Sequence, residues 1–397
     1  MGFWTLLQVA SMPVIQVLVI GLLGALLATG YCNILHADAR NYLNKVVFTV
    51  FTPSLLFSIL SKTVTLDDII SWWFMPVNIG LTMLFGGLLG WLVVKVLRPK
   101  PHLEGLVIAT CATGNYGNLL LIVLPAICKE DGTPFGEDHA TCGSVGLSYA
   151  SFSAALGSIY VWTIAYQLVR NSAIKLEQLE VADELEASKL LNDVDEDANL
   201  QGSLLLEDAR APKPAAASSG WSQVVEVLHR ILHELTAPPT LATIFGFLFG
   251  ATAFLRNLIV GEGAPLRVIQ DSIALLGDGT IPSITLILGG NLTQGLRSSN
   301  IKPWMIVGVV CVRYVFLPVI GICMVKAASG LGLLPADPLF AYVLMLHYSI
   351  PPAMNIGTMT QLFDVAQEEC SVIYLWTYLF AAVALTLWST VYLWMLS

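Results

Sequence analysis

The chain has 397 residues, of which 56% are hydrophobic and only 12% are charged, and its mean hydropathy is +0.73. Soluble domains carry about one quarter charged residues, so this composition excludes a soluble domain and indicates an integral membrane protein. Although the net charge is −9, no basic face predicts a nucleic-acid partner.

Ten stretches are apolar and long enough to cross a membrane, which takes about 17–25 residues. In chain order they lie near residues 8–30, 42–61, 72–97, 104–128, 143–169, 238–256, 272–295, 303–327, 339–362 and 371–396. The first stretch lacks a basic leader and is longer than the apolar core of a signal peptide, so we expect it to remain as a span. The sequence therefore predicts an all-α membrane protein with ten transmembrane helices.

The two halves of the chain carry the same landmarks at similar intervals. Pro13, Pro53, Pro76, Pro125 and Ser144 are separated by 40, 23, 49 and 19 residues. Their counterparts are separated by 43, 21, 49 and 19 residues and are Pro239, Pro282, Pro303, Pro352 and Ser371. This pattern predicts two five-helix repeats, 1–169 and 238–397. Five spans per repeat is an odd number, so the second repeat must be inverted relative to the first.

The connection between the repeats, residues 170–237, is acidic. Residues 170–210 hold 11 of the 28 acids and 4 of the 19 bases, which indicates a solvated, flexible linker rather than a site. Residues 221–236 place apolar side chains at helical spacing opposite a polar face. This pattern predicts an amphipathic helix on the membrane interface, with a partner-binding helix as the alternative.

Orientation follows from the lysines and arginines of the short loops, which are more frequent on the cytosolic side. The richer side would carry Arg40, Lys45, Lys95, Arg98, Lys100, Arg170, Arg297 and Lys302. The other side would carry Lys62, Lys129, Arg256, Arg267 and Lys326. We therefore expect a cytosolic linker and both termini on the opposite, lumenal or external, side.

Two stretches carry Asn, Gly and Pro at the middle of otherwise apolar spans. Residues 113–118 read Thr-Gly-Asn-Tyr-Gly-Asn and run on to Pro125, and residues 348–357 read Tyr-Ser-Ile-Pro-Pro-Ala-Met-Asn-Ile-Gly. Proline removes a backbone donor and breaks a helix, and the freed groups need protein or a water-filled cavity. A matched pair of interrupted helices in two halves is typical of the binding site of a transporter.

Broken helices present free N–H groups and partial positive charge at the N-terminal ends of their second halves, which suits a carboxylate. The candidate substrate-binding residues are Asn115, Asn118, Pro125, Tyr348, Pro351, Pro352, Asn355, Ser54, Ser283 and Tyr160. Each group has a structural alternative. The asparagines could only cap the broken helices, and the tyrosines could be packing residues. The pairs Pro53-Ser54 and Pro282-Ser283 could be simple helix kinks.

Charged residues are scarce within the spans. The carboxylates nearest to them, Glu104 and Asp278, lie close to span ends, whereas coupled carriers usually bind their ion with groups inside the membrane. We therefore expect an uncoupled uniporter. Arg313 is deep in the eighth span, where it would either contact the substrate anion or, as we favour, hold carbonyls of a broken helix.

The seven cysteines are scattered without metal-ligand spacing, so we expect no metal, no cofactor and no catalytic residues. Cys128 and Cys142 bracket the short loop after the fourth span. On a lumenal face they could form a disulfide, and the alternative is a pair of free thiols.

These residues resemble those of the auxin efflux carriers, and within that family the plant PIN-LIKES branch. The resemblance covers both halves, and its most specific pieces are Asn118 with Pro125, Pro351 and Pro352 with Asn355, Val50 to Pro53, and Arg313 with Pro318. It implies a sodium/proton-antiporter-like fold with a scaffold and a transport domain of crossing helices. The short linker and the lack of a carboxylate–lysine pair near the second and third spans depart from the long PIN carriers.

The resemblance further implies that indole-3-acetic acid is carried without a coupling ion across the endoplasmic reticulum membrane. The expected partners are this small molecule and the lipid bilayer, and the sequence leaves a homodimer open. Two alternatives remain: a carrier of another organic acid such as a dicarboxylate, and an auxin-binding receptor or scaffold without transport. Aliphatic and aromatic cavity walls would favour auxin, whereas a second basic residue in the cavity would favour a dicarboxylate.

Overall fold

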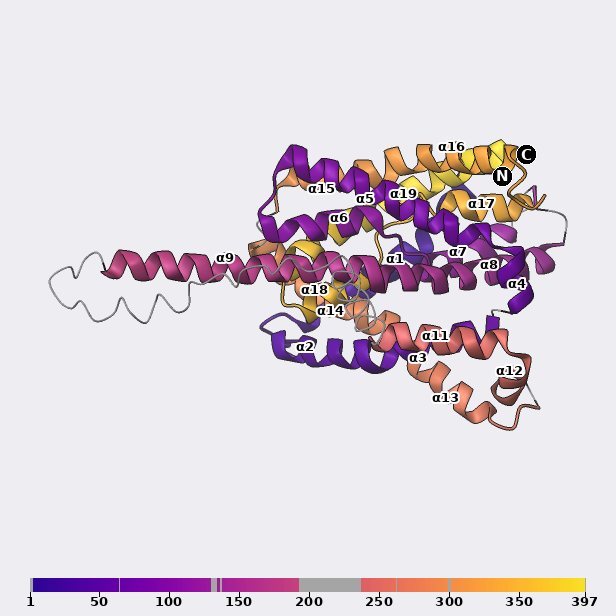
Figure 1. The fold of residues 1–397 in the computed structure, drawn as a ribbon, viewed down its shortest axis with the longest axis horizontal. Coiled ribbons are helices and arrows are strands. Elements are labelled where there is room, and N and C mark those ends of the chain that lie inside the picture. Colours follow the sequence, from indigo (N-terminus) through magenta and orange to yellow (C-terminus); the bar gives the residue numbers. More distant parts are fainter. Residues whose placement is uncertain are drawn as a thin grey trace, which may run out of the picture.

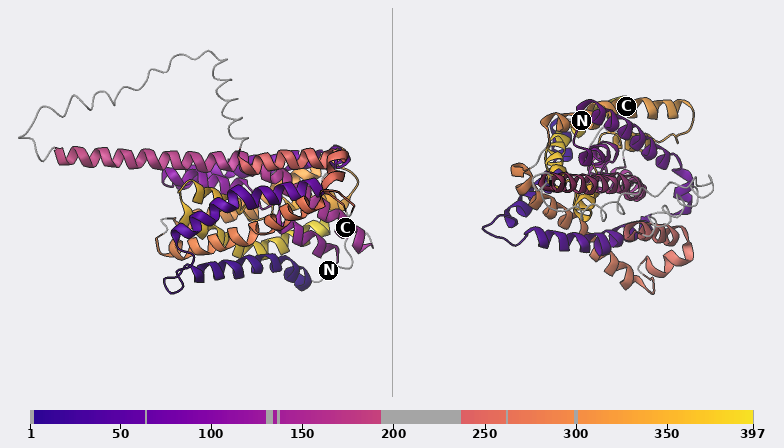
Figure 2. Two further views of the ribbon diagram at one scale, coloured as in Figure 1. Left: turned by 90° about the horizontal axis from the view of Figure 1, so that it is seen from below. Right: turned by 60° about the vertical axis from the view of Figure 1, so that its left-hand side comes forward.

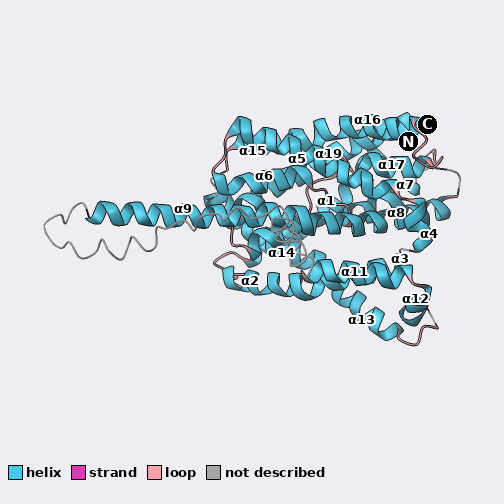
Figure 3. Cartoon of the chain, in the orientation of Figure 1, coloured by secondary structure: helices cyan, strands magenta, loops and turns pink. Residues whose placement is uncertain are grey.

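The computed structural model describes residues 3–63, 65–129, 134–135, 138–192, 237–261, 263–298 and 301–396. Every regular element in these ranges is a helix (Figure 3). The amphipathic helix predicted at 221–236 and the preceding linker residues 193–220 lie outside the described residues.

The α-helices are α1 (Phe3–Leu27), α2 (Ala37–Val46), α3 (Thr52–Thr63), α4 (Leu66–Ser71), α5 (Phe74–Leu97), α6 (Glu104–Ala112), α7 (Asn118–Cys128), α8 (His139–Tyr160), α9 (Tyr166–Asn192), α11 (Pro238–Ala251), α12 (Ala253–Ile259), α13 (Arg267–Asp278), α14 (Thr280–Ser298), α15 (Pro303–Cys311), α16 (Leu317–Gly330), α17 (Pro338–Leu346), α18 (Asn355–Leu362) and α19 (Gln367–Leu396). A 3₁₀ turn, η2 (Pro101–Leu103), precedes α6. Three π-helical segments are η1 (Val47–Phe51), η3 (Val161–Ala165) and η4 (Val312–Phe316).

Six helical runs among the described residues are long and apolar enough to cross a membrane. They are Ala37–Lys62, Phe74–Leu97, His139–Ala182, Arg267–Thr293, Pro303–Gly330 and Gln367–Leu396. A seventh is formed by α11 and α12 if this pair, bent by 103°, counts as one span. The protein is therefore a multi-pass, all-helical membrane protein. Helices also lie over the other predicted spans, and the fourth and ninth are each divided into two short helices, α6 with α7 and α17 with α18.

Helix α9 extends well beyond the predicted end of its span at residue 169 and projects from the bundle (Figures 1 and 2). Its polar part is rich in Glu, Leu, Ala and Lys, which are good helix formers, so an acidic and solvated segment can still be helical. The Lys175 ammonium lies 2.5 Å from the Glu104 carboxylate and ties α9 to the start of α6.

Close packing of small residues joins α1 to α14. A Cβ atom on Gly289 would lie 1.9 Å from the Gly21 carbonyl oxygen, so only glycine permits this approach. Such small-residue contacts are a common basis of helix association in membranes. Helix α3 packs on α11 and α13, and α19 packs on both α1 and α14.

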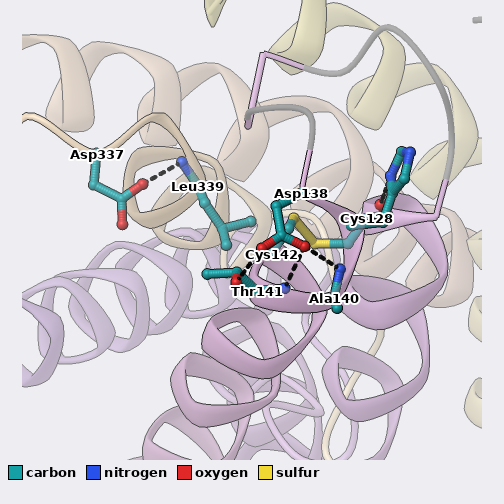
Figure 4. Close-up of a disulfide and its surroundings, with 8 residues drawn as sticks. Cys128, Asp138, Ala140, Thr141, Cys142, Asp337 and Leu339 are labelled. Carbon is teal, nitrogen blue, oxygen red and sulfur yellow. Dashed lines mark hydrogen bonds between the residues drawn. A yellow bond between two sulfur atoms is a disulfide. The ribbon is translucent and has the colours of Figure 1, made fainter.

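A disulfide joins Cys128, at the end of α7, to Cys142, in the first turn of α8, with Cα atoms 5.6 Å apart (Figure 4). Asp138 caps α8 by accepting hydrogen bonds from the backbone N–H groups of Ala140 and Thr141 and from the Thr141 hydroxyl. The bonds from the Thr141 hydroxyl and backbone N–H lower the pKa of the Asp138 carboxyl. Figure 1 places this end of α7 and α8 with the two chain termini, away from the direction in which α9 projects.

Candidate functional site

The two broken helices meet at their breaks. Gly114, between α6 and α7, forms an antiparallel bridge with Pro352, between α17 and α18. The backbone N–H of Asn115 donates to the Pro351 carbonyl at 2.8 Å. The two interrupted segments thus satisfy part of each other's freed backbone, as hydrocarbon surroundings require. The sequence predicted both breaks, and the structure brings them together.

Arg313 lies beside this crossing and is fully buried on η4. Its Nη1 donates to the Cys111 carbonyl at 3.2 Å, and its Nη2 donates to the carbonyls of Ile350 and of Pro351, the latter at 3.2 Å. These carbonyls lie at or just beyond the C-terminal ends of α6 and α17, which are the negative poles of the two helices. The guanidinium neutralises both poles, so the geometry favours the helix-holding role over contact with substrate.

Two tyrosines of α19 complete the support of the crossing. The Tyr378 hydroxyl donates to the Pro352 carbonyl at 3.0 Å and accepts from Nδ2 of Asn115 at 3.0 Å. The Tyr374 hydroxyl donates to the Ala353 carbonyl. Our sequence reasoning missed both residues. Their spacing of four places them on one face of a helix, but nothing in the sequence shows what that face meets.

A cavity of about 70 Å³ lies against the crossing. The crossing contributes Gly114, Asn115, Tyr116, Gly117, Ala353, Met354 and Asn355. The facing walls come from α3 (Thr52, Leu55, Leu56, Ile59), α8 and η3 (Ala154, Gly157, Ser158, Val161) and α14 (Thr280, Ile281, Ile284). None of these lining residues is charged. Because α7 and α18 both begin here, the cavity lies at two positive helix ends.

Four other residues that the sequence suggested as substrate-binding are absent from the residues that line this cavity. Neither Ser54 nor Ser283 is among the residues that line the cavity. The Tyr160 hydroxyl donates to the Pro76 carbonyl at 3.1 Å, which is a packing role. Tyr348 is buried, and its ring lies against Gly321.

Asn118 and Pro125 both lie on α7. Asn118 begins the helix at the cavity, although its side chain is outside the described part of the structure. Pro125 lies further along α7 and does not line the cavity. Thr52 and Thr280 are polar lining residues from the two opposing helices. Sequence analysis named Thr52 only within the Val50 to Pro53 motif and did not name Thr280.

His347 joins the crossing to neighbouring helices. Its Nδ1 lies 3.2 Å from Nδ2 of Asn78 and its Nε2 lies 2.9 Å from the Ser153 hydroxyl. Because the same Asn78 nitrogen also donates to the Leu344 carbonyl at 3.0 Å, it is a donor and His347 Nδ1 is an acceptor. The imidazole is therefore neutral, with its proton on Nε2. The edge-on ring of Tyr116 lies 5.4 Å away.

The fold and the site together define a multi-pass membrane protein built around two crossing broken helices. Residues 9–389 match the family described as "Membrane transport protein". The chain is 60% identical to Protein PIN-LIKES 7 of Arabidopsis thaliana over the whole of both chains. It is 57% identical to PIN-LIKES 5 of the same plant over 99% of each chain, and 30% identical to PIN-LIKES 2 over 96% of this chain and 93% of the other. The chain belongs to this membrane transport family of auxin efflux carriers, in its PIN-LIKES branch.

Proposed function

We propose that the protein carries auxin, indole-3-acetic acid, or a similar small aromatic carboxylate by uncoupled uniport at the crossing. The observation that carries this proposal is the polarity of the crossing. The N-terminal ends of α7 and α18 face a cavity that Asn115 and Asn355 line. The negative, C-terminal ends of the preceding helices, α6 and α17, are bound by the buried cation Arg313. A carboxylate in the cavity therefore meets partial positive charge and amide donors.

The walls of the cavity support a substrate with one charge and an apolar ring. Leucine, isoleucine and valine side chains from α3, α14 and η3 form most of the surface opposite the crossing. A dicarboxylate would leave its second charge against these apolar walls, at a high desolvation cost. The PIN-LIKES family relationship supports the same choice.

The absence of an ion-binding group among the lining residues supports uncoupled transport. No carboxylate is among the described residues that line the cavity, and the neighbouring His347 has both nitrogens engaged while neutral. Arg313 already occupies the place where a cation would otherwise balance the two negative helix ends. The substrate gradient and the membrane potential would then drive the anion.

We further propose ten spans in two inverted repeats, embedded in the endoplasmic reticulum membrane with a cytosolic linker and lumenal termini. Breaks at equivalent positions of the two halves support the repeat. The chain termini and the disulfide lie at the end opposite to the projecting α9 (Figure 1). This arrangement agrees with the orientation predicted from the loop charges.

Competition binding tests the substrate class. Labelled indole-3-acetic acid should bind the purified protein and be displaced by other aromatic monocarboxylates but not by a short dicarboxylate. Displacement by the dicarboxylate at equal concentration, or no binding of the aromatic acid at all, would overturn the proposed specificity.

A further inference from the structure

Two helical runs connect the central cavity with a second, polar cavity at the end from which α9 projects. The second cavity has a volume of about 330 Å³, and its lining includes Arg40, Asn41, Gln361, Asp364, Glu368 and Glu369. The run α2–η1–α3 contributes Asn41 to the outer cavity and Thr52 to the central one. Helix α18, which contacts α2, contributes Gln361 to the outer cavity and Asn355 to the central one.

Side-chain amides bridge these runs between the two cavities. Nδ2 of Asn44 on α2 donates to the Thr358 carbonyl of α18 at 3.0 Å. Nδ2 of Asn291 on α14 donates to Oε1 of Gln361 at 2.8 Å, and Nε2 of Gln361 donates to Oδ1 of Asn41. Asn44 and Asn291 are each 2% exposed. Helix α18 is thus held from two sides by α2 and α14.

We propose that Asn41, Asn44, Asn291 and Gln361 form an amide latch that closes the route from the outer cavity to the substrate site. Asn41 and Gln361 line the outer cavity, and the bond from Asn44 to Thr358 lies further along both runs, before the central cavity. The central cavity is also far smaller than a typical ligand site of about 300–1,000 Å³, as a closed state requires. Release of α18 would join the two cavities.

The bonding of the latch suits reversible opening. Its bonds join neutral groups, and such bonds contribute little net stability because water offers similar partners. Oδ1 of Asn44 and Oδ1 of Asn291 accept no hydrogen bond from the described residues, so water that entered on opening would satisfy them. Helix α18 has eight residues and follows a break in the chain, so it can move without bending a long helix.

The latch rests on the proposed carrier function, but its first test requires no substrate. A Leu55→Cys variant places a thiol on the wall of the central cavity. In sealed vesicles, a membrane-impermeant thiol reagent is added on the side of α9, with the chain lacking this cysteine as background. Asn291→Ala should raise the labelling rate about fivefold, the effect of losing one hydrogen bond of typical net strength.

Gln270→Ala is the matched control, because Gln270 is a buried amide that bonds Ser58 between α13 and α3, away from the latch. It should leave the labelling rate unchanged. Unchanged labelling in Asn291→Ala and in the isosteric Asn291→Asp, with both folded by thermal melting, would overturn the latch. An equal increase of the labelling rate in Gln270→Ala would also overturn the latch.

A chemical lock gives the second test. Cross-linking Asn41→Cys to Gln361→Cys with a bifunctional thiol reagent should stop uptake of labelled indole-3-acetic acid while leaving its binding from the other side. Uptake at the uncross-linked rate would overturn the latch. If the labelling results hold but the parent protein neither binds nor transports auxin, the proposed substrate is wrong and the latch stands.

Discussion

At the scale of single residues, the central feature is that a cation binds the negative helix ends at each break, whereas amide side chains lie near the positive helix ends. Arg313 supplies three hydrogen bonds to carbonyls near the C-terminal ends of α6 and α17. Asn355 begins α18, and Asn115 lies three residues before the start of α7. A permanent cation at the negative ends and amides at the positive ends leave a site that suits an anion.

Replacing Arg313 should test its structural role. Arg313→Ala removes a charged donor from three buried carbonyls, of which that of Pro351 keeps the bond from the Asn115 backbone N–H. Hydrogen bonds to charged groups contribute about 1.5–3 kcal/mol each. We expect a loss of several kcal/mol, seen as a large fall in the thermal unfolding temperature of the detergent-solubilised protein. Arg313→Lys keeps the charge but not the planar guanidinium, so its unfolding temperature should lie between those of the parent protein and Arg313→Ala. A stable Arg313→Ala protein that has lost only substrate binding would show that Arg313 serves the anion instead.

Replacing Asn355 should weaken substrate binding without unfolding the protein. Loss of a hydrogen bond to a carboxylate in Asn355→Ala should cost about 1–3 kcal/mol of binding free energy, measured by equilibrium binding. A double variant with Asn118→Ala should lose more. Ser283→Ala is the control because Ser283 does not line the cavity. Unchanged binding in the folded double variant would remove both asparagines from the site.

At the scale of elements, local chemistry explains what could be predicted. Pro351 and Pro352 with their neighbouring asparagine and glycine predicted one broken helix correctly, because proline acts on its own turn. The expectation that Pro125 breaks the other helix was wrong, because α7 continues through Pro125 and the break lies between Ala112 and Asn118, around Gly114 and Gly117. The crossing of the two broken helices was expected from the matched pair of interruptions and from the family resemblance. The individual contacts, such as that of Asn115 with Pro351, join residues more than 200 positions apart, and the pattern of one segment cannot show its partner. The same reason hid Tyr374, Tyr378 and Thr52. The helical extension of α9 was not predicted, because the negative charge of residues 170–192 indicated a flexible linker although many of these residues are good helix formers.

The link between α7 and α8 carries its own prediction. Cys128→Ser should lower stability, since the bond closes a loop of about 15 residues, for which chain entropy gives about 3 kcal/mol at most. Thermal unfolding of this variant against Cys111→Ser, which removes a buried cysteine outside the bond, separates the bond from packing. Mass spectrometry without reductant should find Cys128 and Cys142 joined. Two free thiols in protein from its native membrane would contradict both the bond and the lumenal face.

At the scale of the whole molecule, a carrier must expose its site to each side in turn. The amide latch closes the end from which α9 projects, and the crossing keeps the broken helices together while the surrounding helices shift. Helix α19 packs against both α1 and α14 and also supports the crossing through Tyr374 and Tyr378. It therefore contacts both the crossing and α14, one of the helices that hold the latch.

The most direct test of the carrier is uptake of labelled indole-3-acetic acid into liposomes that contain only this protein, with membrane potential, sodium and pH set independently. We predict saturable uptake that follows the substrate gradient and the potential, unchanged by sodium at fixed potential. A proton gradient should drive no accumulation beyond that of the acid's own protonation and passive entry. Binding without protein-dependent flux, or accumulation driven by sodium at fixed potential, would contradict the account.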